Sequence, residues 1–236
     1  REASSMVLVD DNFATIVTAV RCGRAIYGNI RKFIRYMLAC NLGEVITMFA
    51  AIVFGLPIPL IPIQILWVNL VTDGLPGIAL GLEAEEDDIM KQPPMDASGG
   101  IFTRRMAWLI IFRGILTGLC TLGAFALVYY NTGVLDIART TAFVTLVLIQ
   151  LVHSFECRSN KKSLFEIGIR GNSFLLISAA VSVLLMLAVV YINPFQKVFS
   201  TVALDLQQWI TIILFTLIGP LAGFAGCSRK FKTSNK

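Results

Sequence analysis

Long apolar runs fill most of the chain, and short polar segments separate them. Six runs are long enough to cross the roughly 30 Å hydrocarbon core of a bilayer, which takes about 20 apolar residues in a helix. The expected spans are residues 34–54, 61–82, 107–130, 140–157, 174–192 and 208–226. The pattern therefore predicts an all-α fold, a polytopic bundle of six transmembrane helices within residues 34–226.

The residues before the first span predict a strand followed by a long helix. Residues 6–9 form a short β-like apolar run, and the polar residues 10–12 can cap a helix that begins near Phe13. Apolar residues then recur at helical spacing into the first span without a breaker. We expect residues 1–11 to close a soluble α/β domain and residues 12–33 to form a cytoplasmic stalk helix.

Two segments between spans have distinctive compositions. Residues 55–62 are rich in proline and too short for anything but a hairpin of adjacent helices. Residues 83–88 are an acidic run, which we interpret as a solvated cytoplasmic loop, with calcium capture or domain docking as the alternatives.

Composition and charge support a membrane location. The chain is 56% hydrophobic and 15% charged, and its mean hydropathy is +0.75, which is typical of an integral membrane protein surrounded by lipid. Seventeen of the 20 Lys and Arg residues fall on one side of the six-span topology. The positive-inside rule then places both termini in the cytoplasm, with residues 227–236 as a tail. The net charge of +5 is thus a topology signal, and no nucleic-acid partner is expected.

The cysteines give little sign of a structural metal or a disulfide framework. No two of the five form a C-x-x-C pair, and His153 is the one histidine that could join them. We therefore expect free thiols.

Polar residues inside two of the spans are the main functional signal. Asn41 and Glu44 are spaced i, i+3 in the first span, and Asn69, Thr72 and Asp73 share a helical face in the second. Carboxylates at membrane depth are costly and occur mainly where they line a pathway or hold an ion. A hard cation such as Ca²⁺ takes six to eight oxygen ligands, which this set suits. Each amide or hydroxyl taken singly could instead join helices by hydrogen bonds.

The second span also carries a helix breaker. Pro76 has no N–H, its ring crowds the carbonyl of Thr72, and Gly74 and Gly77 weaken the helix on either side. Freed carbonyls at this depth are tolerated where they face protein or a polar cavity, and transporters commonly place ion sites beside such breaks.

Three further polar residues have simpler interpretations. We expect Arg113 to extend toward the cytoplasmic surface and His153 to be a packed or hydrogen-bonded helix residue. Glu156 lies near the cytoplasmic end of the fourth span, where contact with the ion path is the lesser alternative.

Several motifs together resemble one known family. They are residues 10–17 (DDNFATIV), 23–27 (GRAIY), 41–44 (NLGE), 67–76 (WVNLVTDGLP) and 204–209 (LDLQQW). The chain resembles the carboxy-terminal membrane half of P-type calcium-transporting ATPases of the sarco/endoplasmic-reticulum type and their bacterial relatives. The six spans would then be the last six of ten.

The resemblance implies a ligand set for the transported Ca²⁺. It consists of Asn41, Glu44, Asn69, Thr72, Asp73 and Asn160. Sodium pumps tend to carry Asp at the place of Asn69, so Asn favours the calcium branch, and the presence of Glu44 favours two ions. Asn160 stands where two-site pumps carry Glu, so one or two ions per cycle remain open, as does Ca²⁺ against Mn²⁺.

The same resemblance implies that catalysis lies outside this sequence. The phosphorylated Asp-Lys-Thr-Gly-Thr motif and the Mg²⁺-binding Gly-Asp-Gly-x-Asn-Asp segment do not occur in it. Residues 1–11 would close a truncated phosphorylation domain, and ATP and Mg²⁺ would bind in the missing amino-terminal half of the same pump. The partners of this chain would be the missing amino-terminal half and membrane lipid. The full-length pump would be a monomer, in the cell membrane of a bacterium or an endomembrane of a eukaryote.

The leading hypothesis is the ion-transport half of an ATP-driven calcium pump, with no ATP hydrolysis by this fragment alone. A stand-alone secondary transporter or channel that uses the same acids is one alternative. A non-catalytic membrane subunit is another, and it would leave the cost of burying Glu44 and Asp73 unexplained.

Overall fold

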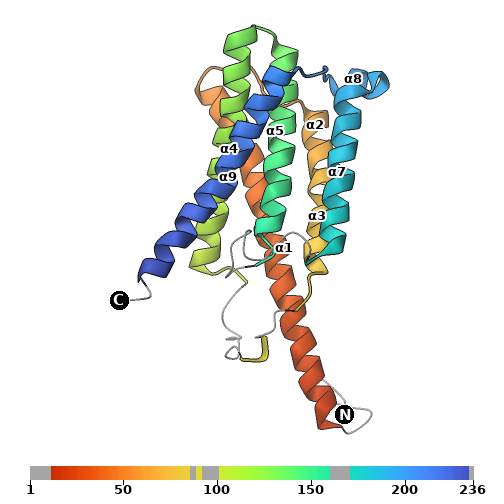
Figure 1. The fold of residues 1–236 in the computed structure, drawn as a ribbon, viewed down its shortest axis with the longest axis vertical. Coiled ribbons are helices and arrows are strands. Elements are labelled where there is room, and N and C mark those ends of the chain that lie inside the picture. The colour runs from red at the N-terminus through yellow and green to blue at the C-terminus, as the bar shows by residue number, and fades with distance from the viewer. Residues whose placement is uncertain (1–11, 86–88, 92–100, 160–170, 234–236) are drawn as a thin grey trace.

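A computed structural model describes residues 12–85, 89–91, 101–159 and 171–233, and every regular element among them is helical (Figure 1). The elements are α1 (Phe13–Val53), α2 (Pro62–Trp67), a π-helical turn (Val68–Thr72), α3 (Gly74–Gly81), a 3₁₀ turn (Ile89–Lys91), α4 (Arg104–Thr132), α5 (Leu135–Glu156), α7 (Ser173–Tyr191), α8 (Asn193–Phe199) and α9 (Leu206–Thr233). The strand predicted at residues 6–9 lies outside the described residues.

Within the described residues, five helical segments are long and apolar enough to cross a membrane: α1, residues 62–81, α4, α5 and α7. They match the first five predicted spans. The sixth span remains a prediction. The part of α9 whose side chains the structure describes, Leu206–Leu221, is apolar but shorter than a full membrane span. Many large apolar side chains face outward on these helices, among them Phe49, Leu66 and Leu184, each at least 60% exposed. Such a surface suits lipid and identifies an integral membrane protein.

Helix α1 is continuous from the predicted stalk into the first span, as expected. Its first turn is capped by the Asn12 side chain, which accepts a hydrogen bond from Ala14 N at 3.0 Å. The helix ends before Gly55, whose φ of 65° lets the chain turn into the predicted hairpin. The N-terminal part of α1 projects beyond the ends of the other helices (Figure 1).

Glycines bring α1 and α4 into close contact. A Cβ added at Gly114 would lie 2.6 Å from Leu42 Cγ, and one at Gly118 would lie 2.6 Å from Ile46 Cγ2. Small residues four apart commonly allow membrane helices to approach in this way. This packing holds the part of α1 around Leu42 and Ile46 firmly against α4.

Helix α5 is the most enclosed of the candidate spans, with 67% of its most apolar window buried. It begins at Leu135, five residues before the predicted start, because Gly133 in the left-handed conformation ends α4 and the new helix starts at once. The buried core between α4, α5 and α7 contains Phe125, Phe143, Leu146, Val147 and Met186.

Helix α8 has no counterpart among the predicted elements. It is seven residues long, with Pro194 in its first turn, which suits a helix start. Gln64 Nε2 of α2 donates to the carbonyl of Phe199 at 3.0 Å, and the Trp67 and Phe199 rings meet edge to face. The segment between α7 and α9 therefore packs against the start of the broken second span.

Candidate cation-binding site

The second span is broken at the predicted place, and the break begins earlier than Pro76. Residues 68–72 form a wide π-helical turn in which Asp73 N donates to the carbonyl of Val68 at 2.9 Å. Pro76 supplies no N–H for the Thr72 carbonyl, and the Tyr36 hydroxyl lies 3.5 Å from that oxygen. The break therefore leaves backbone oxygen available beside Asp73.

Glu44 of α1 lies buried between two amide side chains. Its Oε2 accepts a hydrogen bond from Asn69 Nδ2 at 2.9 Å, and its Oε1 accepts one from Gln150 Nε2 at 3.1 Å. Asn69 comes from the π-helical turn and Gln150 from α5, so three separate elements meet at one carboxylate. The structure thus brings Glu44 and Asn69 together.

Asp73 is fully buried beside the same site, close enough to Glu44 for the two carboxyl groups to interact electrostatically. Its Oδ1 accepts a hydrogen bond from the Tyr36 hydroxyl at 3.0 Å. Its Oδ2, Thr72 Oγ1 and Gln150 Oε1 are buried, and none has a hydrogen-bond partner among the described residues. Buried polar atoms are almost always paired, so the unpaired oxygens of Thr72, Asp73 and Gln150 are candidate ligands for a cation.

We call the residues that meet here the Glu44–Asp73 site: Glu44, Asn69, Thr72, Asp73 and Gln150. It offers carboxylate, amide, hydroxyl and backbone oxygens, the donor set of a hard cation such as Ca²⁺. No group of three or more His, Cys, Asp or Glu side chains that could hold a metal occurs in the described part of the chain. The donors gathered here are mixed oxygens: two carboxylates, two amides and a hydroxyl.

Of the six predicted ligands, Asn41 is not brought into the site. Asn41 lies on the exposed side of α1 and makes no hydrogen bond to another described residue. Asn160 lies outside the described residues.

Tyr36 and Gln150 contact the acids, yet sequence reasoning missed both. Tyr36 precedes Glu44 by eight residues and so shares its helical face, a spacing that could have identified it. Gln150 is a polar residue, 1% exposed, within an apolar helix. Its position in the chain could not reveal which partner it would meet.

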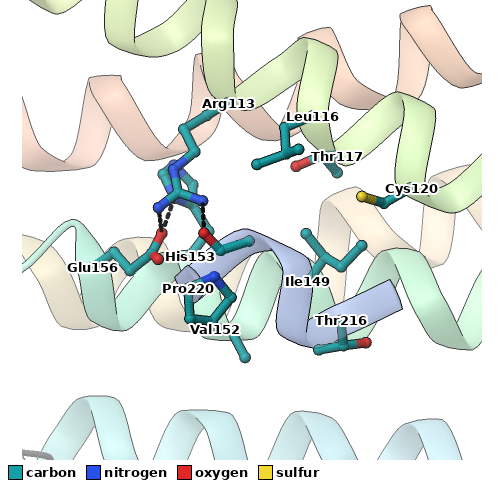
Figure 2. Close-up of a pocket in the computed structure, with 11 residues that line it drawn as sticks. Arg113, Leu116, Thr117, Cys120, Ile149, Val152, His153, Glu156, Thr216 and Pro220 are labelled. Carbon is teal, nitrogen blue, oxygen red and sulfur yellow. Dashed lines mark hydrogen bonds and ion pairs between the residues drawn. The ribbon is translucent and has the colours of Figure 1, made fainter. Parts of the chain in front are cut away.

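His153 is hydrogen-bonded within α5, as predicted. Its Nδ1 lies 3.1 Å from Glu156 Oε2, its Nε2 lies 3.4 Å from Cys157 Sγ, and its ring is 6.1 Å from that of Tyr36. The prediction for Arg113 is wrong. Its guanidinium turns inward to Glu156 Oε2 at 2.5 Å instead of extending to the membrane surface (Figure 2). Without Arg113, Glu156 would lose the cationic partner of a largely buried carboxylate, which is costly.

The interpretation of residues 83–88 as a solvated loop is wrong for Glu83. Arg158 donates to Glu83 Oε1 through Nε at 3.0 Å and Nη2 at 2.9 Å, and Asn172 Nδ2 donates to Oε2 at 2.6 Å. The Arg158 and Glu83 side chains are 3% and 8% exposed. Glu83 lies two residues after the end of α3, so the pair ties that end of α3 to the ends of α5 and α7. Residues 86–88 lie outside the described residues.

The chain matches a known protein family and two bacterial proteins. The family described as "Cation transporting ATPase, C-terminus" matches residues 57–225. The chain is 51% identical over 214 residues to a "Calcium-transporting ATPase" of Bacillus subtilis (strain 168), covering 90% of the chain and 24% of that protein. It is 43% identical over 232 residues to "Calcium-transporting ATPase 1" of Bacillus cereus, covering 92% and 26%.

A plant relative is more distant. The chain is 35% identical over 241 residues to "Calcium-transporting ATPase 3, endoplasmic reticulum-type" of Arabidopsis thaliana, covering 90% of the chain and 24% of that protein. The chain thus spans about a quarter of the length of the curated relatives it matches.

Proposed function

Because the chain belongs to the cation-transporting ATPases, as their carboxy-terminal region, we propose that it is the ion-transport half of an ATP-driven calcium pump. The observation that carries the proposal is the Glu44–Asp73 site, where three buried oxygens lack a hydrogen-bond partner among the residues that the structure describes. The relatives named above are calcium-transporting ATPases, which supports Ca²⁺ as the transported ion.

Calcium would bind where the amide groups of Asn69 and Gln150 now contact the Glu44 carboxylate. Asn69 and Gln150 each donate an N–H to Glu44, and each carries a carbonyl oxygen on the same amide. Rotation of the amides would exchange N–H donors for oxygen ligands while the Glu44 carboxylate turns to the ion. Asp73 would contribute its unpaired Oδ2 and Thr72 its hydroxyl.

The remaining ligands would come from elsewhere in the full-length pump. Asn41 lies on the exposed side of α1, one helical turn from Glu44, where a helix from outside this chain could cover it. Asn160 would supply a neutral carbonyl oxygen. The sequence of this chain contains no phosphorylation motif. Phosphorylation, with ATP and Mg²⁺, would therefore occur in the part of the pump outside this chain.

In the membrane, α9 would form the sixth span. Both termini would then lie in the cytoplasm, with α1 as the stalk that links the phosphorylation domain to the ion site. The excess of Lys and Arg on one side of that topology supports this orientation. The host membrane would be the cell membrane of a bacterium or an endomembrane of a eukaryote, and the full-length pump would act as a monomer.

Equilibrium binding of radioactive calcium to the full-length pump tests the proposal. Native protein should bind calcium, and Glu44→Gln should abolish binding at one ion position or both because it removes a ligand charge. A rise in calcium bound per protein with Asn160→Glu would mean that the native pump carries one ion. Native protein that binds no calcium, or a Glu44→Gln variant that binds as the native protein does, would overturn the site assignment.

A further inference from the structure

A second buried polar cluster lies apart from the Glu44–Asp73 site, between α4, α5 and α9. Arg113 Nη2 pairs with Glu156 Oε2 at 2.5 Å, and Arg113 Nη1 donates to the carbonyl of Gly219 at 2.9 Å. Both side chains of the pair are 14% exposed. Figure 2 shows Arg113 reaching from α4 across a small cavity to the end of α5. One guanidinium therefore joins three membrane helices.

Helix α9 offers acceptors to this cavity. Pro220 lies within the helix, supplies no N–H for the Thr216 carbonyl and crowds that oxygen. Thr216 Oγ1 belongs to a residue that also lines the cavity, and it is buried with no hydrogen-bond partner in the described part of the chain. Arg113 is a donor to α9 at this junction, through its bond to the Gly219 carbonyl.

Glu156 connects the junction to the ion-site face of α5. His153 Nδ1 lies 3.1 Å from the same Glu156 oxygen that Arg113 contacts, and the His153 ring packs near that of Tyr36, the donor to Asp73. Gln150, three residues before His153, lies on the same helical face and donates to Glu44. Rotation of α5 about its own axis would move both Gln150 and His153 away from α1.

We propose that Arg113 is a positioning residue for ion binding. By holding Glu156 toward α4 and α9, it fixes the rotation of α5, so that Gln150 reaches Glu44 and His153 packs against Tyr36. The inference rests on the proposed function, because its main consequence is a change in calcium affinity. It differs from a purely structural role, in which loss of the pair would lower stability and leave calcium affinity unchanged.

The first test measures the calcium concentration that half-maximally supports phosphorylation of the full-length pump by ATP. Arg113→Gln and Glu156→Gln should each raise that concentration roughly tenfold, as loss of groups that orient metal ligands commonly does. The maximal phosphoenzyme level should stay native. The reversed pair, Arg113→Glu with Glu156→Arg, should recover most of the loss. Arg139→Gln is the control, because Arg139 lies at the other end of α5 and donates to the Ile58 carbonyl.

A double-mutant cycle identifies the route of the effect. If Arg113 acts through Gln150, then Arg113→Gln should add little once Gln150→Ala is present, since the two changes remove the same contact. A native half-maximal concentration in Arg113→Gln would overturn the proposal. So would fold-changes that multiply fully in the double variant.

A measurement without calcium separates this inference from the proposed function. Cysteines introduced as Glu44→Cys and Gln150→Cys, with the native cysteines replaced by serine, should be joined readily by a short crosslinker. Adding Arg113→Gln should lower the crosslinking rate several-fold if α5 rotates, and an unchanged rate would overturn the inference. If native pump shows no calcium-dependent phosphorylation, the proposed function fails, and the crosslinking rate alone decides the positioning role.

Discussion

Removing one partner of the Glu83–Arg158 pair should destabilise the protein strongly. Arg158 donates to Glu83 through both Nε and Nη2, and the side chains are 3% and 8% exposed. Glu83→Gln or Arg158→Gln removes one member of this buried ion pair, which costs about 3–5 kcal/mol of unfolding free energy. Replacing both, as Glu83→Leu with Arg158→Met, leaves no unpaired charge at this pair. Asn172 keeps its bond to the Ala79 carbonyl at 3.1 Å.

The assay is equilibrium unfolding of the purified protein in mixed micelles, for the native protein, both single variants and the apolar double variant. The double variant should lie within about 2 kcal/mol of native, well above either single variant, because burial of an intact ion pair contributes little net stability. Single variants that lose less than about 1 kcal/mol, or losses that add in the double variant, would refute the reasoning.

Two further predictions concern helix packing and the ion site. Gly118→Ala should lower the free energy of unfolding by about 1–3 kcal/mol, because its Cβ would lie 2.6 Å from Ile46 Cγ2. Gly23→Ala is its control, since a Cβ there meets nothing within 4 Å and should not destabilise the helix. Equal losses of unfolding free energy in both variants would contradict the packing argument. Asn69→Ala should raise the calcium concentration for half-maximal phosphorylation of the full-length pump at least tenfold, since it removes both an oxygen ligand and the donor that orients Glu44. A native value in that titration would exclude Asn69 from the site.

The sequence predicted the fold well wherever local patterns determine it. Helix α1 follows from the Asn12 cap and from apolar residues at helical spacing with no breaker before Gly55. The break in the second span follows from Pro76 and its neighbouring glycines. The π-helical turn that precedes Pro76 could not be predicted in the same way. Such a turn contains one residue more than an α-helical turn, and no particular residue type marks it in the sequence.

Only part of the candidate site could be predicted from the sequence, because packing between helices decides which side chains meet. Spacing within one helix places Glu44 near Asn41, yet packing decides which of the two faces the bundle, and Asn41 faces away from it. Gln150 and Glu83 bind partners from distant parts of the chain, Glu44 and Arg158. No periodicity in the sequence encodes those contacts.

ATP-driven uptake of radioactive calcium into vesicles that carry the full-length pump tests the central claim most directly. Native protein should accumulate calcium only with ATP. Asp73→Asn should abolish uptake because it removes the more deeply buried of the two carboxylate charges at the Glu44–Asp73 site. Asp136→Asn, which alters an exposed carboxylate at the start of α5, should leave uptake native. Uptake that continues with Asp73→Asn, or native protein that moves calcium without ATP, would contradict the account.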